Sequence, residues 1–173
     1  MLVLGIDPGF RSLGLALVDT AAGEVLATRT VDCGQVYYAQ HKTVNRALEE
    51  LFEEFPLPQR VATENVPNGF AGKGSGGRTA CTMHWVLGGV GLWAAQHGIP
   101  MAGIAPKALK TFACKVIGVP YTSWKGAKGS RAQAKWGISE AVKVLTGSDE
   151  SSSDHEADAV LAAFALHGAK LRP

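Results

Sequence analysis

Several features that would direct the chain to a membrane or an oxidising compartment are missing from its 173 residues. No apolar stretch approaches the ~20 residues that a membrane-spanning helix needs, because glycine, histidine or charged residues interrupt each one. The opening MLVLGIDPG has no basic region and soon reaches Asp7, so we predict no signal peptide. Only three cysteines occur and none has CxxC spacing, which argues against a disulfide framework or a zinc site and favours a reducing compartment.

Acidic residues are absent from a long central segment of the chain. No Asp or Glu occurs between Asn65 and Ser139, whereas nine basic residues do. The rest of the chain has eight basic and fifteen acidic residues, so +9 in the centre stands against −7 at the two ends. This separation predicts a surface that binds a polyanion beside an acidic pocket, with an ordinary solvated basic face as the alternative.

The chain contains enough apolar residues for a core. With 46% hydrophobic and 18% charged residues, we expect one globular domain over residues 1–173. Apolar runs over 2–6 and 13–18 and an alternating run over 25–32 are separated by short turns, which predicts three consecutive antiparallel strands. A fourth strand is expected over 60–66, parallel to the first because a helix precedes it.

Helical patterns alternate with the later strands. The periodicity predicts helices over 43–55, over 79–97, from Pro106, over 130–145 and from Asp154 to about His167, with a fifth strand over 99–104. The predicted fold is therefore α/β: a mixed five-stranded sheet, its first three strands antiparallel, with helices on both faces. The first and fourth strands should lie side by side at its centre.

Two carboxylates fall on those two central strands. Asp7 comes directly after the first apolar run, and Glu64 lies in the fourth run among apolar neighbours. If the strands are adjacent, the two carboxylates meet, and like charges at close range call for a cation such as Mg²⁺. The alternatives are a turn-forming Asp-Pro-Gly for Asp7 and a solvated strand end for Glu64.

The last predicted helix adds a third group of polar residues. Residues three and four apart share a helix face, so Asp158 can act with either His155 or Asp154. The apolar stretch 159–166 should pack on the sheet and hold this first turn over the sheet edge. The alternative for the acids is that they complement the helix dipole. The proposed set of ligands for two metal ions is Asp7, Glu64, His155 and Asp158.

These motifs resemble those of the RuvC family of Holliday junction resolvases, within the RNase H-like superfamily. GIDPGFRSLGLALVD is similar to the first family motif, ATENVP to the second, and HEADAVLAAFA to the C-terminal motif. The resemblance implies that Asp7, Glu64 and Asp158 are the metal-binding catalytic carboxylates. His155 stands where the family usually has an aspartate in D-x-x-D-A, with the adjacent Asp154 as the alternative ligand.

The resemblance also implies a function. It implies an RNase H-like homodimer in the bacterial cytoplasm, host- or phage-encoded, that binds four-way DNA junctions and nicks two opposing strands symmetrically. A branch-migration motor is left open as a partner. Mg²⁺ is the expected cofactor, with Mn²⁺ as a substitute or as the preferred ion, since an imidazole is a softer ligand than a carboxylate. We expect Phe70 to wedge or stack at the crossover. The expected DNA contacts are Phe70, Lys73, Arg78, Lys107, Lys110, Lys128 and Arg131.

Other readings of the same residues remain open. Because a fold does not fix a substrate, a related nuclease for flaps, other branched DNA or RNA–DNA hybrids is one alternative. A junction-binding protein with weak catalysis is another, suggested by His155. RuvC-like proteins of ribosomal-RNA processing are a third, although Arg11 stands three residues before Gly14, which favours the resolvase. A sugar-kinase or actin-like ATPase is a fourth alternative, but that fold needs two such domains and 173 residues supply only one. His155 has a second candidate role as general base.

Overall fold

Five strands form one sheet in the computed structural model, which describes residues 1–34, 37–66, 76–147 and 153–168. The strand order is β3-β2-β1-β4-β5, with the first three strands antiparallel and β4 and β5 parallel to β1. The predicted mixed sheet, with the first and fourth strands adjacent, is therefore confirmed. The strands are β1 (Leu2–Pro8), β2 (Ser12–Asp19), β3 (Glu24–Asp32), β4 (Arg60–Glu64) and β5 (Met101–Ile104).

Helices occur where the periodicity predicted them, with one substantial difference in length. The first helix begins at Tyr37 and not at Thr43, because its opening turns carry the buried polar residue Gln40, which interrupts the apolar pattern. A short 3₁₀ turn, η2 (Tyr121–Ser123), lies in the predicted loop. The helices are α1 (Tyr37–Glu54), α2 (Gly76–Gln96), α3 (Pro106–Ile117), α4 (Arg131–Thr146) and α5 (Asp154–Gly168).

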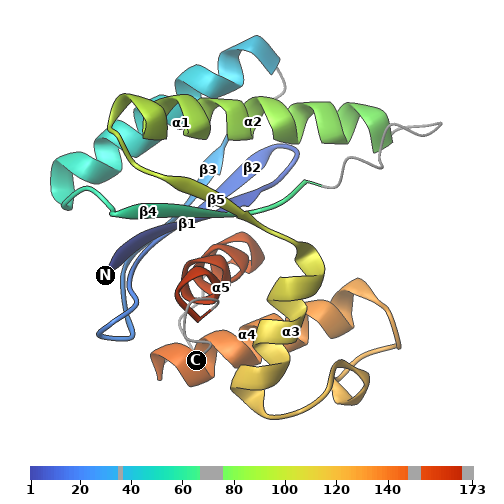
Figure 1. Cartoon of the computed structure of the whole chain (residues 1–173). Helices are drawn as coiled ribbons and strands as arrows, with labels where there is room; N and C mark the ends of the chain where they lie inside the picture. The colour runs from blue at the N-terminus through green and yellow to red at the C-terminus, as the bar shows by residue number, and fades with distance from the viewer. Residues whose placement is uncertain (35–36, 67–75, 148–152, 169–173) are drawn as a thin grey trace.

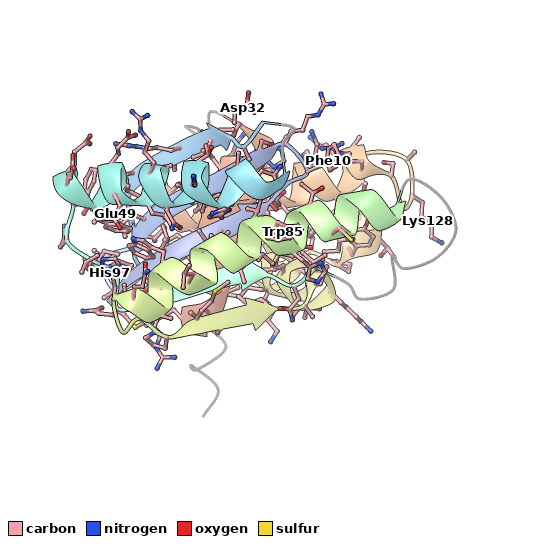
Figure 2. The ribbon with its side chains drawn as sticks, turned by 90° about the horizontal axis from the view of Figure 1, so that it is seen from above. Phe10, Asp32, Glu49, Trp85, His97 and Lys128 are labelled. Atoms are coloured by element: carbon pink, nitrogen blue, oxygen red, sulfur yellow. The ribbon has the colours of Figure 1, made fainter. Side chains whose placement is uncertain are left out.

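The helices cover both faces of the sheet, as predicted. In Figure 1, α1 and α2 lie on one face, and α5 lies on the other with α3 and α4 packed beyond it. Figure 2, seen from above, shows α1 and α2 side by side across the sheet, with Trp85 on α2. Within the residues that the structure describes, none of these helices is both long and apolar enough to cross a membrane.

The alternation of side chains along β1 decides which face receives the first carboxylate. Leu4 and Ile6 belong to the core under α1 and α2, whereas Val3 belongs to the core under α5. Because strand side chains alternate with a period of two, Asp7 shares the α5 face with Val3. Glu64 shares that same face with Ala62 on β4, which packs under α5. The sheet therefore presents both carboxylates towards α5.

Glycines let α5 approach the sheet very closely. A Cβ atom added at Gly5 on β1 would lie 1.9 Å from the carbonyl oxygen of Ala159, and one at Gly14 on β2 would lie 2.1 Å from that of His155. Neither distance is compatible with a real side chain, so the main chain of α5 rests directly on two strands. This contact sets the height of the first turn of α5 above the carboxyl end of β1.

Candidate active site

Asp7 and Glu64 lie at the carboxyl ends of two parallel neighbours. The β1–β4 register pairs Ile6 with Thr63, so the next positions along the two strands are those of the carboxylates. Asp7 is buried. Burial, followed by the negative charge of Asp7, raises the pKa of Glu64 to about 7, while the positive charge of Lys110 opposes the rise. The predicted pair of carboxylates is brought together here.

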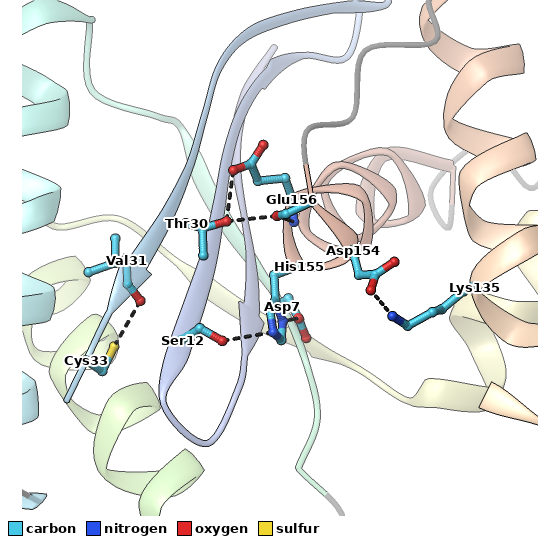
Figure 3. A network of polar contacts seen from close by, with 10 residues as sticks. Asp7, Ser12, Thr30, Val31, Cys33, Lys135, Asp154, His155 and Glu156 are labelled. Atoms are coloured by element: carbon cyan, nitrogen blue, oxygen red, sulfur yellow. Dashed lines mark hydrogen bonds and ion pairs between the residues drawn. The ribbon is translucent and has the colours of Figure 1, made fainter. Parts of the chain in front are cut away.

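His155 joins this pair from the first turn of α5. Its Nδ1 lies 2.5 Å from Oδ2 of Asp7, and its Nε2 lies 2.8 Å from Oγ of Ser12 (Figure 3). The hydrogen bond with Asp7 raises the pKa of the imidazole, against the opposing effect of burial. Both ring nitrogens are thus occupied, and the ring is fixed between β1 and β2. Sequence reasoning did not identify Ser12, although its place two residues before Gly14 puts it on the strand face that meets α5.

Asp158 follows one turn later on the same face of α5. Burial raises its pKa to about 7, and the charges of Asp7 and Glu64 add to the rise, so the three carboxylates interact. His155 and Lys135 oppose the rise. Asp154, the alternative to His155, instead forms an ion pair with Lys135 of α4 (Figure 3). His155, and not Asp154, is therefore the residue that contacts Asp7.

The donor types at this site suit a hard divalent cation. Three carboxylates and an imidazole are ligands that Mg²⁺ and Mn²⁺ accept. Burial, followed by repulsion between the carboxylates, raises the pKa values of Glu64 and Asp158, and a bound cation would oppose both effects. As the side chains stand, no three His, Cys, Asp or Glu residues of the described ranges converge as ligands of one ion. The hydrogen bond between His155 and Asp7 engages two of the four groups, so ion binding requires that this bond opens.

Glu156 has a role that sequence reasoning missed. The alternative considered for the acids of this turn was that they complement the helix dipole. Glu156 is also only 6% exposed, so its carboxylate needs partners within the protein. The hydroxyl groups of Thr28 and Thr30 on β3 donate to its two carboxylate oxygens, at 2.9 and 2.8 Å. The hydroxyl group of Ser153 accepts a hydrogen bond from the backbone N–H of Glu156, and its oxygen lies 2.8 Å from that of Thr30. The first turn of α5 is thereby anchored to β3.

The predicted DNA-contacting residues are only partly described by the structure. Lys110 lies close enough to Glu64 to affect its pKa, and its Nζ lies 5.4 Å from the ring centroid of Tyr121. The positive charge of Arg131, at the start of α4, acts to lower the pKa of His155. The other two described members, Lys107 and Lys128, are exposed. The remaining predicted contacts lie outside the described residues: Phe70, Lys73 and the side chain of Arg78.

Comparisons with known proteins agree with this geometry. The family model for crossover junction endodeoxyribonuclease RuvC matches residues 3–165. A curated RuvC from Moorella thermoacetica is 33% identical over 115 residues, which cover 64% of this chain and 65% of that relative, slightly less than two thirds of its length.

Solved structures show the same fold. A Thermus thermophilus RuvC in complex with a Holliday junction substrate superposes with a TM-score of 0.74 at 22% identity, covering 99% of this chain and 96% of that one. A second structure of the Thermus thermophilus protein gives 0.72 at 21% identity, with the same coverage. The yeast mitochondrial Holliday junction resolvase Ydc2 gives 0.50 at 14% identity, covering 94% of this chain and 77% of that one.

The structural matches confirm the predicted RNase H-like fold. The family model covers nearly the whole chain and includes the positions of Asp7, Glu64, His155 and Asp158. From this match it follows that the chain belongs to the RuvC family of crossover junction endodeoxyribonucleases.

Proposed function

We propose that this protein is a divalent-metal-dependent endonuclease that resolves four-way DNA junctions by paired, symmetric nicking in recombination and repair. One observation carries the proposal: β1, β4 and the first turn of α5 bring Asp7, Glu64, His155 and Asp158 together in a chain of the RuvC family. A related solved structure is of a RuvC in complex with a Holliday junction substrate, which supports the same substrate here. We place this activity in the bacterial cytoplasm.

The four residues have distinct parts in the proposed mechanism. Asp7, Glu64 and Asp158 would provide oxygen ligands, and His155 a nitrogen ligand, for Mg²⁺ or Mn²⁺. Such ions, when bound, lower the pKa of an attacking water and stabilise the departing oxygen of a phosphodiester. His155 shares a proton with Asp7 through Nδ1 while Ser12 orients the ring at Nε2. The hydrogen bond between Asp7 and His155 would thus break when the Asp7 carboxylate turns to bind an ion.

Basic residues beside the site would hold the DNA backbone. Lys110 and Arg131 are near enough to Glu64 and His155, respectively, to affect their pKa values. Phosphate contacts of this type position the strand and carry no sequence information themselves. We therefore assign Lys110 and Arg131 to the scissile strand and the exposed Lys107 and Lys128 to more distant phosphates.

The proposed function is tested by a cleavage assay on four labelled substrates: a four-way junction, a flap, a linear duplex and an RNA–DNA hybrid. Each is incubated with Mg²⁺ and with Mn²⁺, beside the Asp7→Asn variant. We expect paired symmetric nicks in the junction alone and none with the variant. Preferential cutting of the flap or the hybrid would make the protein a different RNase H-like nuclease, and binding without cutting would make it a junction-binding protein.

We also propose that two copies of the chain pair through α2. Trp85 and Leu92 are each 53% exposed, and with Cys81 and Gly88 they form one apolar stripe at helical spacing. The stripe borders a groove of about 540 Å³ that also reaches His41 of α1. A two-fold axis at this stripe would match the two-fold symmetry of a four-way junction.

Introducing a charge into this stripe tests the pairing. We expect Trp85→Glu to convert a dimer into a monomer, measured by light scattering after gel filtration. Val144→Glu, on α4, serves as the control because Val144 is 61% exposed and lies on another helix. A wild-type protein that is monomeric, or a Trp85→Glu variant that remains dimeric, would contradict the proposed interface.

A further inference from the structure

A short turn beside the candidate site carries two exposed side chains that the proposed mechanism does not use. β1 ends at Pro8 and β2 begins at Ser12, so residues 9–11 form the whole connection. Phe10 is 38% exposed and Arg11 is exposed as well. The guanidinium carbon of Arg11 lies 5.8 Å from the ring centroid of Phe10. Within the described ranges, no carboxylate forms an ion pair with Arg11, so its charge is available to a ligand.

This turn is rigid because hydrogen bonds and steric constraints hold it on both sides. The N–H of Gly9 donates to the carbonyl oxygen of Ser12 at 2.8 Å, which closes the turn. The N–H of Cys33, a buried residue after β3, donates to the carbonyl oxygen of Arg11 at 2.7 Å. A Cβ at Gly9 would lie 2.4 Å from that same Ser12 oxygen, so only glycine fits. Phe10 and Arg11 are therefore presented by a preformed backbone.

The turn also borders the reacting groups directly. Asp7 is three residues before Phe10, and Ser12, which ends the turn, is hydrogen bonded to His155. The position that a Cβ of Gly9 would occupy lies 3.1 Å from Cε1 of His155. In Figure 2, Phe10 lies towards the same end of the molecule as the basic residue Lys128 and away from His97. This turn is therefore in a position to contact a DNA strand whose phosphate reaches Asp7 and His155.

We propose that the turn is a nucleotide clamp, in which Phe10 stacks on the base next to the scissile phosphate and Arg11 binds a neighbouring phosphate. The inference rests on the proposed function. Aromatic rings bind bases of any sequence through their π faces, and a guanidinium matches phosphate geometry. The base must be at least partly unstacked to receive the ring, which costs least where pairing or stacking is already broken, as at the crossover of a junction. The clamp would thus favour cutting at the branch point over cutting in a continuous duplex.

An isolated exposed phenylalanine needs no functional explanation. Phe10 differs from the other exposed apolar residues in three ways: it carries a cation against its ring, it stands on a rigid turn, and that turn contacts a proposed catalytic residue. Leu57, by comparison, is 47% exposed in the connection before β4, at the opposite end of that strand from Glu64. It supplies a matched control.

The test compares substitutions at Phe10 in single-turnover cleavage of a four-way junction. Stacking on an aromatic side chain is worth about 1–3 kcal/mol per base, so we expect Phe10→Ala and Phe10→Leu each to slow cleavage about tenfold or more. Phe10→Tyr keeps the ring and should cut at nearly the wild-type rate, as should Leu57→Ala. Melting temperatures should not change, because none of these substitutions removes a core residue.

A fluorescent base gives an independent readout. With 2-aminopurine next to the scissile phosphate and EDTA present, we expect binding of the wild-type protein and of Phe10→Tyr to quench the base, whereas Phe10→Leu should not. For Arg11→Gln, the slope of log affinity against log salt should fall by about one relative to the wild type. Arg46→Gln, on α1, should leave that slope unchanged.

Several results would overturn the clamp. If Phe10→Ala and Phe10→Leu both cleave and quench as the wild type does, Phe10 does not contact the base. If Phe10→Ala loses cleavage and quenching but Phe10→Leu keeps them, the contact is apolar packing and not stacking. If the wild-type protein does not cut the junction but cuts another DNA, only the proposed function is overturned. The clamp is then tested on that DNA, by the ratio of variant to wild-type cleavage rates.

Discussion

At the scale of single residues, His155 is the one member of the four proposed ligands that is not a carboxylate. Its two nitrogens are held by Asp7 and Ser12, so the ring cannot rotate without losing a hydrogen bond. The hydrogen bond with Asp7 raises the pKa of the imidazole and favours its protonated form in the metal-free protein. Ligation of a metal ion by His155 therefore requires the loss of a proton.

The His155→Asp substitution separates the two candidate roles of this residue. If His155 is a metal ligand, an aspartate can replace it, and we expect activity to be retained with the preference shifted from Mn²⁺ towards Mg²⁺. The measurement is the junction cleavage rate with each ion at equal concentration. Collapse of the rate with both ions would count against the ligand role and would favour a general base, with Asp7→Asn as the inactive reference.

Asp7, Glu64 and Asp158 were predictable from the sequence because each occurs where an apolar strand or helix pattern meets a polar position. The contacts of Ser12 and Glu156 were not predictable in this way. The contact of Ser12 with His155 depends on the height of α5 above the sheet. Glu156 is bound by Thr28 and Thr30, which lie 128 and 126 residues away in the chain. Local sequence shows only an acidic first turn, which the helix dipole explains equally well.

At the scale of secondary-structure elements, assembly of the site depends on how closely α5 approaches the sheet. Two glycines allow its main chain to touch β1 and β2, and Glu156 ties its first turn to β3. Ala159 and Ala163, the buried residues of α5 that meet Gly5, have short side chains that allow this approach. His155 and Asp158 are thus positioned by three strands together.

Gly14→Ala tests this arrangement. The new methyl group would meet the carbonyl oxygen of His155, so α5 must shift. We expect a loss of about 1–3 kcal/mol in the free energy of unfolding, typical of overpacking, and a larger proportional loss of cleavage than of stability. Urea unfolding and single-turnover cleavage measure the two effects.

Gly91→Ala on α2 provides the matched control for Gly14→Ala. Its Cβ would meet only the sulfur of Met101, at an ordinary 3.9 Å, and alanine is the better helix former by about 1 kcal/mol. We expect this variant to be as stable as the wild type or more stable, with unchanged cleavage. Equal behaviour of the two variants would show that the close approach of α5 has no special importance.

The boundaries of elements show where sequence reasoning was weaker. The strands and helices themselves followed from apolar periodicity, because that periodicity directly reflects which face is buried. The three antiparallel neighbours and the adjacency of the first and fourth strands followed from the lengths and types of the connections. The first turns of α1 were missed because Gln40, a polar residue, is fully buried there and donates to the carbonyl oxygen of Gly34. Hydropathy patterns cannot detect a polar side chain that is buried in this way.

At the scale of the whole molecule, charge is arranged around the acidic site much as the sequence suggested. Seven of the nine basic residues of the central segment belong to α3, α4 or the connection between them, on the side of the sheet that α5 covers. The acid-free segment also contributes α2 on the other face, where the exposed stripe is apolar. These seven basic residues and the apolar stripe of α2 are therefore on opposite sides of the sheet.

The site should make the metal-free protein less stable as the pH rises. The pKa values of Glu64 and Asp158 are raised to about 7, so between about pH 4 and pH 7 the folded protein keeps protons that the unfolded chain has released. The raised pKa of His155 acts in the same direction, since its stabilising effect is lost as the pH passes the folded-state value. We expect the melting temperature in EDTA to fall from about pH 5.5 to about pH 8.

Added Mg²⁺ and substitution of the two carboxylates provide the controls for this pH dependence. Mg²⁺ should raise the melting temperature more at the higher pH than at the lower, because it then binds ionised carboxylates without displacing protons. The double variant Glu64→Gln, Asp158→Asn should show a flatter profile and little response to Mg²⁺. A melting temperature in EDTA that rises over this pH range would contradict the assignment of the raised pKa values.

The separation of the candidate site residues along the chain affects when the site can assemble during synthesis. Asp7 leaves the ribosome early, but His155 and Asp158 follow about 150 residues later. At the usual 5–20 residues per second, translation of that stretch takes roughly 8–30 seconds, during which the α5 face of β1 and β2 has no cover. A nascent or truncated chain that lacks α5 has neither the complete set of proposed ligands nor this half of the core. We therefore expect the proposed nuclease to be inactive until α5 has been synthesised and has packed on the sheet.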